Sequence, residues 1–265
     1  MERLMVVKLD GQGCTAEAWL NGLPVARVTP LAPLSVVPVH EAALAGANRL
    51  ELVVGPDAGA AGAAALLQTA PHAMAAQAHL LLPRIGHTID EGQSRTLARL
   101  EWACAAGDPV TLPARRIQET ELQIRFPRWR WIDAPVVQPT PALVQEAHAF
   151  VASIARDLAR GQTESFLAAT RLRTEELAIA YQRSPESEAV RLREWLDQMY
   201  ASSCLAWQPL APDEMKLRPL AGGRLLDCVG GDGRAALTTV PDKTGNSLAL
   251  PLKLSVVEGR FYVLR

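Results

Sequence analysis

The stretch "AEAWLNGLPVARV", residues 16–28, constrains the fold more than any other part of this sequence. Apolar and polar side chains alternate over residues 16–20, and Asn21-Gly22 then separates this run from a second apolar run. Both central residues of a type I′ turn need a positive φ, which Asn and Gly tolerate best. The stretch therefore predicts a β-hairpin, and with it an antiparallel sheet early in the chain.

Other short runs in the first half have the same period of two. They are "SVVPV", "NRLELVVGP", "AQAHLLL", "RTLARLEWACAA" and "ETELQIRF", with turn residues between them and no long helical pattern. Such a series is typical of an all-β sandwich, which we predict for residues 1–134. The Gly- and Ala-rich residues 55–72 are predicted to form a loop, with a functional lid as the alternative.

The segment "AWLNGLPV" followed by "SVVPVHEAALAGANRLELVV" resembles the jelly-roll sandwiches of the galactose-binding-like type. In that family a strand–NG–strand hairpin precedes a Gly-x-Asn entry into the next strand, and the domains occur as accessory modules of glycoside hydrolases. The resemblance implies a jelly-roll fold, and it raises carbohydrate binding as one functional alternative. No sugar-binding position can be matched here, so no ligand residue is carried over.

The stretch "RFPRWRWIDAPVVQPTPALVQEA", residues 125–147, mixes arginines and tryptophans with prolines. Alternation over residues 122–126 predicts a strand that Pro127 ends, because proline cannot donate to a ladder. Trp129 and Trp131 then form a second short run of period two, with the indoles packed inward. A base-stacking platform is the alternative, but it would need a positive groove as well as aromatics. Residues 135–141 are predicted to be a short stiff linker.

The second half begins with helical signals and ends with strand signals. Thr140-Pro141, Thr163 and Ser184-Pro185 are predicted helix starts. Six strand-like runs follow: "CLAWQPL", "EMKLRPL", "RLLDCV", "RAALTTV", "SLALPLKLSVV" and "RFYVLR". Consecutive strands joined by short turns must be antiparallel. Residues 142–265 are therefore predicted to be an α+β domain, with three helices packed on an antiparallel meander sheet.

Three helices leading into a curved meander that ends in "GRFYVLR" resemble the NTF2-like, or cystatin-like, fold. That family includes small-molecule isomerases and dehydratases as well as non-catalytic binding or dimerising modules. Its catalytic members carry acid–base residues inside the cone. None of those positions can be matched in this sequence, so the resemblance implies a fold and not an activity.

Charge and composition argue against several classes of partner. Residues 1–134 carry 12 basic and 13 acidic side chains, and residues 135–265 carry 15 of each, so neither half has the basic excess of a nucleic-acid-binding domain. We find neither a signal peptide nor a run of roughly 20 apolar residues, and we expect a cytoplasmic bacterial protein without membrane contact. The 4 cysteines form no CxxC pair, so no metal site or other cofactor is predicted.

Asp227 is the most notable single residue, because it interrupts the apolar pattern of "RLLDCV". It is a candidate for lining a ligand pocket, and an exposed strand position is the alternative. The other pocket candidates are Tyr181, Tyr200, Trp207 and His148. His148 and Asp157 lie nine residues apart on opposite faces of one helix, so they are no dyad. No residue is assigned a catalytic role, and "GGDG" at 230–233 is predicted to be a turn.

The last strand candidate, "RFYVLR", is apolar on both faces, which requires a cover on each. Tyr262 and Leu264 are therefore predicted to lie at a domain or subunit interface. The leading hypothesis is a non-catalytic binding or assembly protein that binds a protein partner or itself. The alternatives are a small-molecule enzyme of the isomerase, dehydratase or hydrolase type using a pocket in the C-terminal cone, and carbohydrate binding by the N-terminal sandwich.

Overall fold

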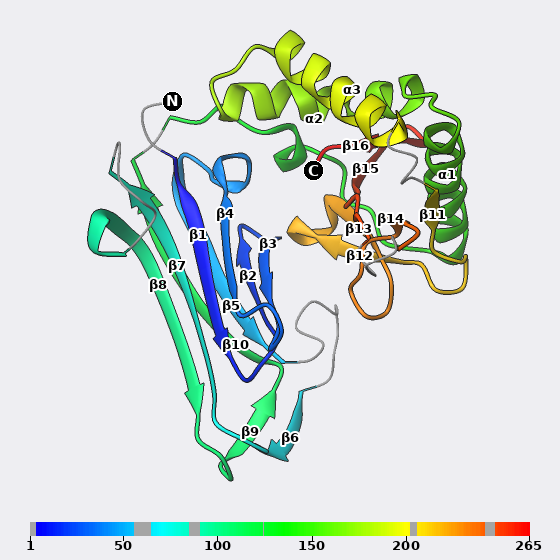
Figure 1. Cartoon of the computed structure of the whole chain (residues 1–265). Coiled ribbons are helices and arrows are strands. Elements are labelled where there is room, and N and C mark those ends of the chain that lie inside the picture. The colour runs from blue at the N-terminus through cyan, green and yellow to red at the C-terminus, as the bar shows by residue number, and fades with distance from the viewer. Residues whose placement is uncertain (1–3, 56–64, 85–90, 124, 202–205, 242–246) are drawn as a thin grey trace. The chain divides into compact units, whose positions relative to one another are not determined.

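The computed structural model describes residues 4–55, 65–84, 91–123, 125–201, 206–241 and 247–265. In this part of the chain there are sixteen strands and three α-helices, and every strand pairing between them is antiparallel. Internal contacts divide the chain into two compact units, Met1–Arg128 and Trp129–Arg265. In the described residues of the first unit the regular elements are strands and short 3-10 turns, whereas the three helices lie in the second unit (Figure 1).

Two four-stranded sheets form most of the first unit. Their strand orders are β4-β1-β7-β8 and β10-β5-β2-β3. The strands are β1 (Val6–Gln12), β2 (Ala16–Leu20), β3 (Leu23–Val28), β4 (Leu34–Pro38), β5 (Gly46–Val54), β7 (Met74–Pro83), β8 (Ser94–Cys104) and β10 (Ala114–Leu122). Only the β2–β3 and β7–β8 connections are hairpins within one sheet, so the chain otherwise passes from sheet to sheet.

The predicted hairpin at Asn21-Gly22 is present. The two residues have φ values of 54° and 77°, as a type I′ turn requires. The Asn21 amide donates to the carbonyl of Ala42 and to Oδ1 of Asn48, each at 2.8 Å. Asn48 is itself buried and holds the loop before β5 through both donors and acceptors of its side chain. The turn is thus anchored to the entry of the neighbouring strand.

The core of the first unit follows the alternation of the strands. On β8, Ala98, Leu100 and Trp102 are buried, while Arg99 and Glu101 point outward. Leucines from the inner faces of both sheets are fully buried, and burial of each such side chain stabilises the fold by about 1.5–3 kcal/mol. Burial along β8 therefore alternates with the period of two that predicted a strand here.

Two predictions for the first half are wrong in detail. Residues 66–69, expected in a loop, form strand β6 (Leu66–Thr69), which pairs with β9 (Pro109–Leu112). Short-range composition did not predict this strand because its partner lies about forty residues further along the chain. Strand β10 ends at Leu122, so the described residues 123, 125 and 126 do not continue the strand that alternation over residues 122–126 predicted. Residues 56–64, which are half of the Gly- and Ala-rich stretch, lie outside the described residues.

The three predicted helices are confirmed as α1 (Pro141–Ala159), α2 (Glu164–Ala180) and α3 (Pro185–Ala201). Thr140 caps α1, its side chain accepting the Leu143 N–H at 3.2 Å, with proline in the first turn. Gly161 follows α1 with a φ of 73°, a conformation that favours glycine. All three helices contribute buried side chains to one hydrophobic core with the strands, and Phe150 of α1 contacts Phe261 there with ring centroids 5.3 Å apart.

The six predicted C-terminal strands are present, but they do not form a single meander. They are β11 (Trp207–Pro209), β12 (Lys216–Leu220), β13 (Leu225–Val229), β14 (Leu237–Thr239), β15 (Lys253–Val257) and β16 (Arg260–Val263). The main sheet has the order β12-β13-β15-β16, and β11 pairs with β14 separately. The sheet forks at Cys228, whose N–H donates to Leu252 while its carbonyl accepts from Ala236.

The Trp-rich stretch belongs to the second unit. Trp129 and Trp131 are buried as predicted, but Arg130–Ile132 is a 3-10 turn rather than a strand. The Arg130 N–H donates to Glu176 of α2 at 2.5 Å, and the Arg265 guanidinium lies 5.7 Å from the centre of the Trp129 ring. Within the predicted linker, the N–H of Val137 donates to Gly223.

Candidate interaction surface

The connection from β3 to β4 is a rigid turn with an apolar tip. Thr29 and Ala32 exchange both backbone hydrogen bonds, at 3.0 and 3.1 Å, and the Thr29 hydroxyl accepts a third from Ala32 N–H. Pro30 restricts φ at the tip. The next residue, Leu31, is 97% exposed. The turn therefore presents a leucine to solvent on a backbone with little freedom to fold it away.

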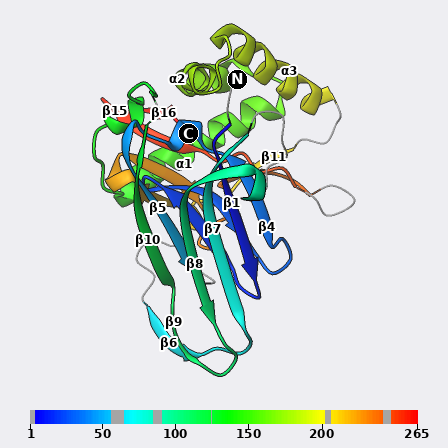
Figure 2. The same ribbon diagram turned by 90° about the vertical axis from the view of Figure 1, so that its left-hand side faces the viewer.

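Strand β4 lies at the margin of its sheet, next to β1 (Figure 2). Gly11 N–H bonds to the carbonyl of Pro33, and Val39 N–H bonds to the carbonyl of Met5, so the odd-numbered residues of β4 face β1. Antiparallel ladders alternate bonded and non-bonded pairs, so the backbones of Leu34 and Val36 point away from the sheet. No hydrogen bond to these two backbones is found within the described part of the chain.

The side chains of the same two residues are exposed and apolar. Leu34 is 56% exposed and Val36 is 38% exposed. They lie on the outer face of the sheet, directly opposite Asp10 and Lys8 of β1, which form an ion pair at 3.3 Å. We call Leu31, Leu34 and Val36, with the free backbone of the last two, the β4 edge surface.

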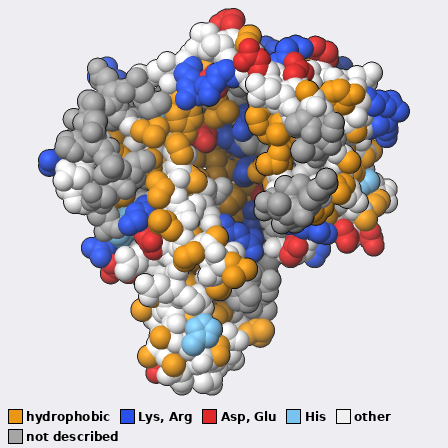
Figure 3. Space-filling view, in the orientation of Figure 1, with side chains coloured by type: hydrophobic (Ala, Val, Ile, Leu, Met, Phe, Trp, Pro, Cys, Tyr) orange, Lys and Arg blue, Asp and Glu red, His pale blue; other side chains and the backbone are white. Residues whose placement is uncertain are grey.

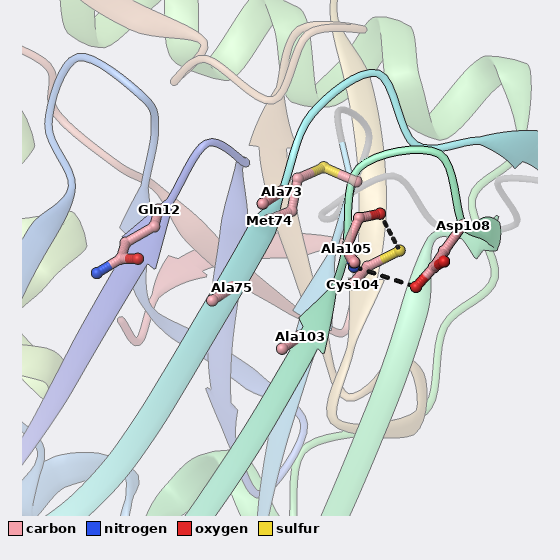
Figure 4. Close-up of a pocket in the computed structure, with 8 residues that line it drawn as sticks. All are labelled: Gln12, Ala73, Met74, Ala75, Ala103, Cys104, Ala105 and Asp108. Atoms are coloured by element: carbon pink, nitrogen blue, oxygen red, sulfur yellow. Dashed lines mark hydrogen bonds between the residues drawn. The ribbon is translucent and has the colours of Figure 1, made fainter.

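A shallow hollow opens beside the C-terminal ends of β1 and β8 in the same sheet (Figure 4). It has a volume of about 420 Å³, and its walls come from β1, β7, β8 and the turn after β8. Half of the lining residues are alanines; the polar ones are Gln12 and Asp108, whose carboxylate accepts the Ala105 N–H at 3.3 Å. Cys104 donates weakly to the Ala105 carbonyl. An adjoining hollow of about 490 Å³ shares Cys104 and Asp108 and adds Arg116 and Thr111.

Asp227 is buried rather than exposed, which makes the exposed-strand alternative wrong. Its carboxylate lies 2.6 Å from Nη2 of Arg218, its cross-strand neighbour on β12, and both side chains are less than a tenth exposed. Lys253 of β15 is its neighbour on the other side. The adjacent Cys228 points into the helix-facing core, so Asp227 points to the opposite face of the sheet. Burial, and secondarily the Asp227 charge, raises the pKa of the Cys228 thiol far above its ordinary value.

The other predicted pocket residues do not gather around Asp227. His148 of α1 is half-buried and its Nε2 lies 2.9 Å from the Leu210 carbonyl. Trp207 is buried in the helix-facing core. Tyr181 ends α2 beneath the Arg183 guanidinium, 5.9 Å from the ring centre. Tyr200 is 50% exposed, at the end of α3 beside Gly161.

Of the two predicted interface residues, Tyr262 lies on β16, and Leu264 follows just after that strand ends at Val263. Tyr262 pairs with Ser255 and is half-buried, while Leu264 is buried. Phe261 and Val263 point to the helix-facing core on the opposite side. Their place at a domain or subunit interface stays a prediction.

On the face shown in Figure 3, Lys and Arg side chains lie in separate groups, with Asp and Glu beside several of them. Among the described residues, no three His, Cys, Asp or Glu side chains are grouped so that they could hold a metal ion. No helix in the described ranges is both long and apolar enough to cross a membrane.

Comparison of the chain with protein-family models, with curated proteins and with solved structures finds no match. The residues of the β4 edge surface were not singled out from the sequence. The signal for them is "TPLAPLSVVP", where prolines at 30, 33 and 38 bracket apolar residues. Within sheets, proline is confined to edges and strand ends, so this spacing is typical of an edge strand.

Proposed function

We propose that this protein is a non-catalytic protein-interaction module that binds through the β4 edge surface. The observation that carries the proposal is Leu31, 97% exposed on a turn closed by three hydrogen bonds. Isolated exposed apolar residues are ordinary on protein surfaces. Here Leu34 and Val36 continue the apolar surface along the next strand, and a rigid turn loses little conformational entropy when a partner covers it.

The unpaired strand edge supports the same reading. An exposed edge is a template for another strand, and proteins commonly protect one with lysines or a covering loop. On β4 proline stands only at the end of the strand, at Pro38, and the outward side chains before it are leucine and valine. A surface that offers both backbone hydrogen bonds and apolar side chains is suited to bind a protein segment.

A non-catalytic role is supported by how the ionisable groups are distributed. Asp227 is neutralised by Arg218 on the sheet face opposite the helices, whereas His148 bonds to a backbone carbonyl on the helical side. General acid–base chemistry needs its groups within hydrogen-bond reach of one substrate. Asp227 and His148, which were candidates from the sequence, therefore lie in two separate places and not around one substrate site.

The finer fold assignments belong to the same proposal. Two facing four-stranded sheets with repeated crossings between them support a jelly-roll sandwich of the galactose-binding-like type in residues 1–134. Three helices on a curved antiparallel sheet support an NTF2-like domain in residues 142–265. Cys14, Cys104 and Cys228 are free, which supports a reducing compartment such as the cytoplasm.

Quantitative co-purification tests the proposed function. The tagged full chain is compared with Leu31→Glu and with Leu67→Glu, a matched control at a leucine of β6 that is 73% exposed. We expect a defined set of proteins to be retained by the wild type and by Leu67→Glu but lost from Leu31→Glu, at equal thermal stability. Identical retention by all three chains, both of other proteins and of a co-expressed untagged copy of the chain, would contradict the proposal.

A further inference from the structure

We infer that the partner of the β4 edge surface is a second copy of this chain, with the two β4 strands paired antiparallel about a two-fold axis at Ser35. The inference rests on the proposed function and names the partner. Pairing would join two four-stranded sheets, each of order β4-β1-β7-β8, into one continuous sheet. Such an isologous contact closes on itself and leaves no free β4 edge.

The backbone of β4 is self-complementary in this arrangement. The outward-facing donors and acceptors belong to Leu34 and Val36, one on either side of Ser35. If Leu34 pairs with Val36 of the partner subunit, each of the two equivalent pairs exchanges two N–H to C=O hydrogen bonds. All the free backbone groups of these two residues are then satisfied.

The neighbouring prolines restrict the pairing to this register. Pro38 is the next outward-facing residue, and it has no N–H to donate. On the other side, the N–H and C=O of Ala32 are both used within the turn. If the pairing of the two β4 strands shifted by two residues, it would include Pro38 or Ala32 and would therefore lose hydrogen bonds. If it shifted by one residue, odd-numbered residues, whose backbone groups face β1, would stand opposite the outward-facing ones. The edge is open over a short segment centred on Ser35, which favours a closed pair over open-ended assembly.

The side chains are compatible with the same axis. Paired residues of an antiparallel ladder point to the same face, so Leu34 and Val36 would meet their two equivalents in an apolar strip on the outer face. Lys8 lies next to Val36, and Asp10 lies next to Leu34. Across the four strands, the side chains would then follow in the order Lys8, Val36, Leu34 of the partner subunit and Asp10 of the partner subunit. Each such row has a positive charge at one end and a negative charge at the other.

The other margins of the two four-stranded sheets in the first unit are less suited to this role. Strand β8 is tied to β10 of the other sheet, where the Thr120 hydroxyl donates to the Leu97 carbonyl at 3.0 Å and Arg99 N–H donates to Gln118 at 2.9 Å. Strand β3 carries the exposed Arg27, and its register with β2 is irregular. Charges and bulges are the features that discourage edge pairing.

Site-directed crosslinking tests the axis directly. Ser35 would face Ser35 of the partner subunit in a non-hydrogen-bonded pair, whose Cα atoms lie about 4.5 Å apart. That separation falls within the range that a disulfide spans. Val37→Cys is the matched control, because its two copies would lie about 14 Å apart along the strands. We expect mild oxidation to convert Ser35→Cys into a disulfide-linked dimer. The fraction of crosslinked dimer in Val37→Cys should not exceed the fraction that the native cysteines produce in the wild type.

Sedimentation of the full chain supplies the second readout. We expect a concentration-dependent dimer that Leu34→Lys abolishes and Leu67→Lys leaves unchanged. The inference is overturned if the wild type stays monomeric up to roughly 1 mM, a range that includes weak interfaces, and Ser35→Cys crosslinks no more than Val37→Cys. In that case Leu31-dependent capture of other proteins would still support the proposed function. If neither self-association nor Leu31-dependent capture is observed, the β4 edge surface is not a binding surface.

Discussion

Nη2 of Arg218 lies 2.6 Å from Oδ2 of Asp227, across neighbouring strands and shielded from water. Breaking a buried ion pair leaves one uncompensated charge, so we predict that Asp227→Ala lowers the free energy of unfolding by about 3–5 kcal/mol. The matched control is the exposed pair Arg234–Glu214, at 3.0 Å, where Glu214→Ala should cost about 1 kcal/mol or less. Urea unfolding measures both, and equal costs would contradict the burial of Asp227.

Trp129 should matter for stability more than its arginine neighbours do. It is 1% exposed, and truncating a buried large aromatic costs about 3–5 kcal/mol, so Trp129→Ala should destabilise strongly. Trp195→Ala, on α3 at a residue 37% exposed, is the control and should cost less. Arg130→Ala should have a small but measurable effect, because its side chain bonds to Glu175 and Leu172. Salt-sensitive binding of single-stranded nucleic acid that disappears in Arg128→Ala or Arg130→Ala would instead restore the base-stacking alternative.

The boundary between the units can be tested with two fragments. If residues 135–141 were only a linker, residues 129–134 would belong to the first domain. Fragments 129–265 and 138–265 would then be equally stable. The buried Trp129 and Trp131, and the Val137 bond to Gly223, predict that 129–265 unfolds at a distinctly higher temperature. Thermal melts followed by circular dichroism decide the question. Indistinguishable melting temperatures would support the linker and contradict the packing of residues 129–137.

The three described cysteines should differ in reactivity. The thiolate is the nucleophile, and burial raises the pKa of both Cys14 and Cys228, so neither should react with iodoacetamide in the native chain near pH 8. Cys104 is half-buried beside the hollow in Figure 4 and should be alkylated. Peptide mass spectrometry quantifies each site, and native labelling of Cys228 at the rate of Cys104 would contradict the structure.

Local chemistry made several elements predictable from the sequence. Asn21-Gly22 indicates a turn because few pairs of residues accept a positive φ at both positions. Thr140-Pro141 indicates a helix start because the threonine hydroxyl can cap the helix and because the first helical residue does not need the N–H that proline lacks. The inward face of β8 follows from a period of two. In each case the decisive interaction lies within a few residues of the chain.

Long-range pairing set the limit of prediction. Strand β6 depends on β9, the fork at Cys228 depends on Leu252 and Ala236, and the burial of Asp227 depends on Arg218. Neither Leu31 nor Leu34 stands out by type, since leucine is usually interior. Their exposure follows from the turn and from the edge position of β4, and both are properties of the assembled sheet.

Residue-resolved hydrogen exchange along β4 tests the central claim most directly. The amides of Ser35 and Val37 face β1 and should be protected in dilute solution, whereas those of Leu34 and Val36 should exchange fast. In the assembled form, whether concentrated chain or chain bound to the proteins that Leu31→Glu fails to retain, we predict that Leu34 and Val36 become protected while Ser35 and Val37 change little. Fast exchange at Leu34 and Val36 in every assembly would contradict the assignment of β4 as the binding edge.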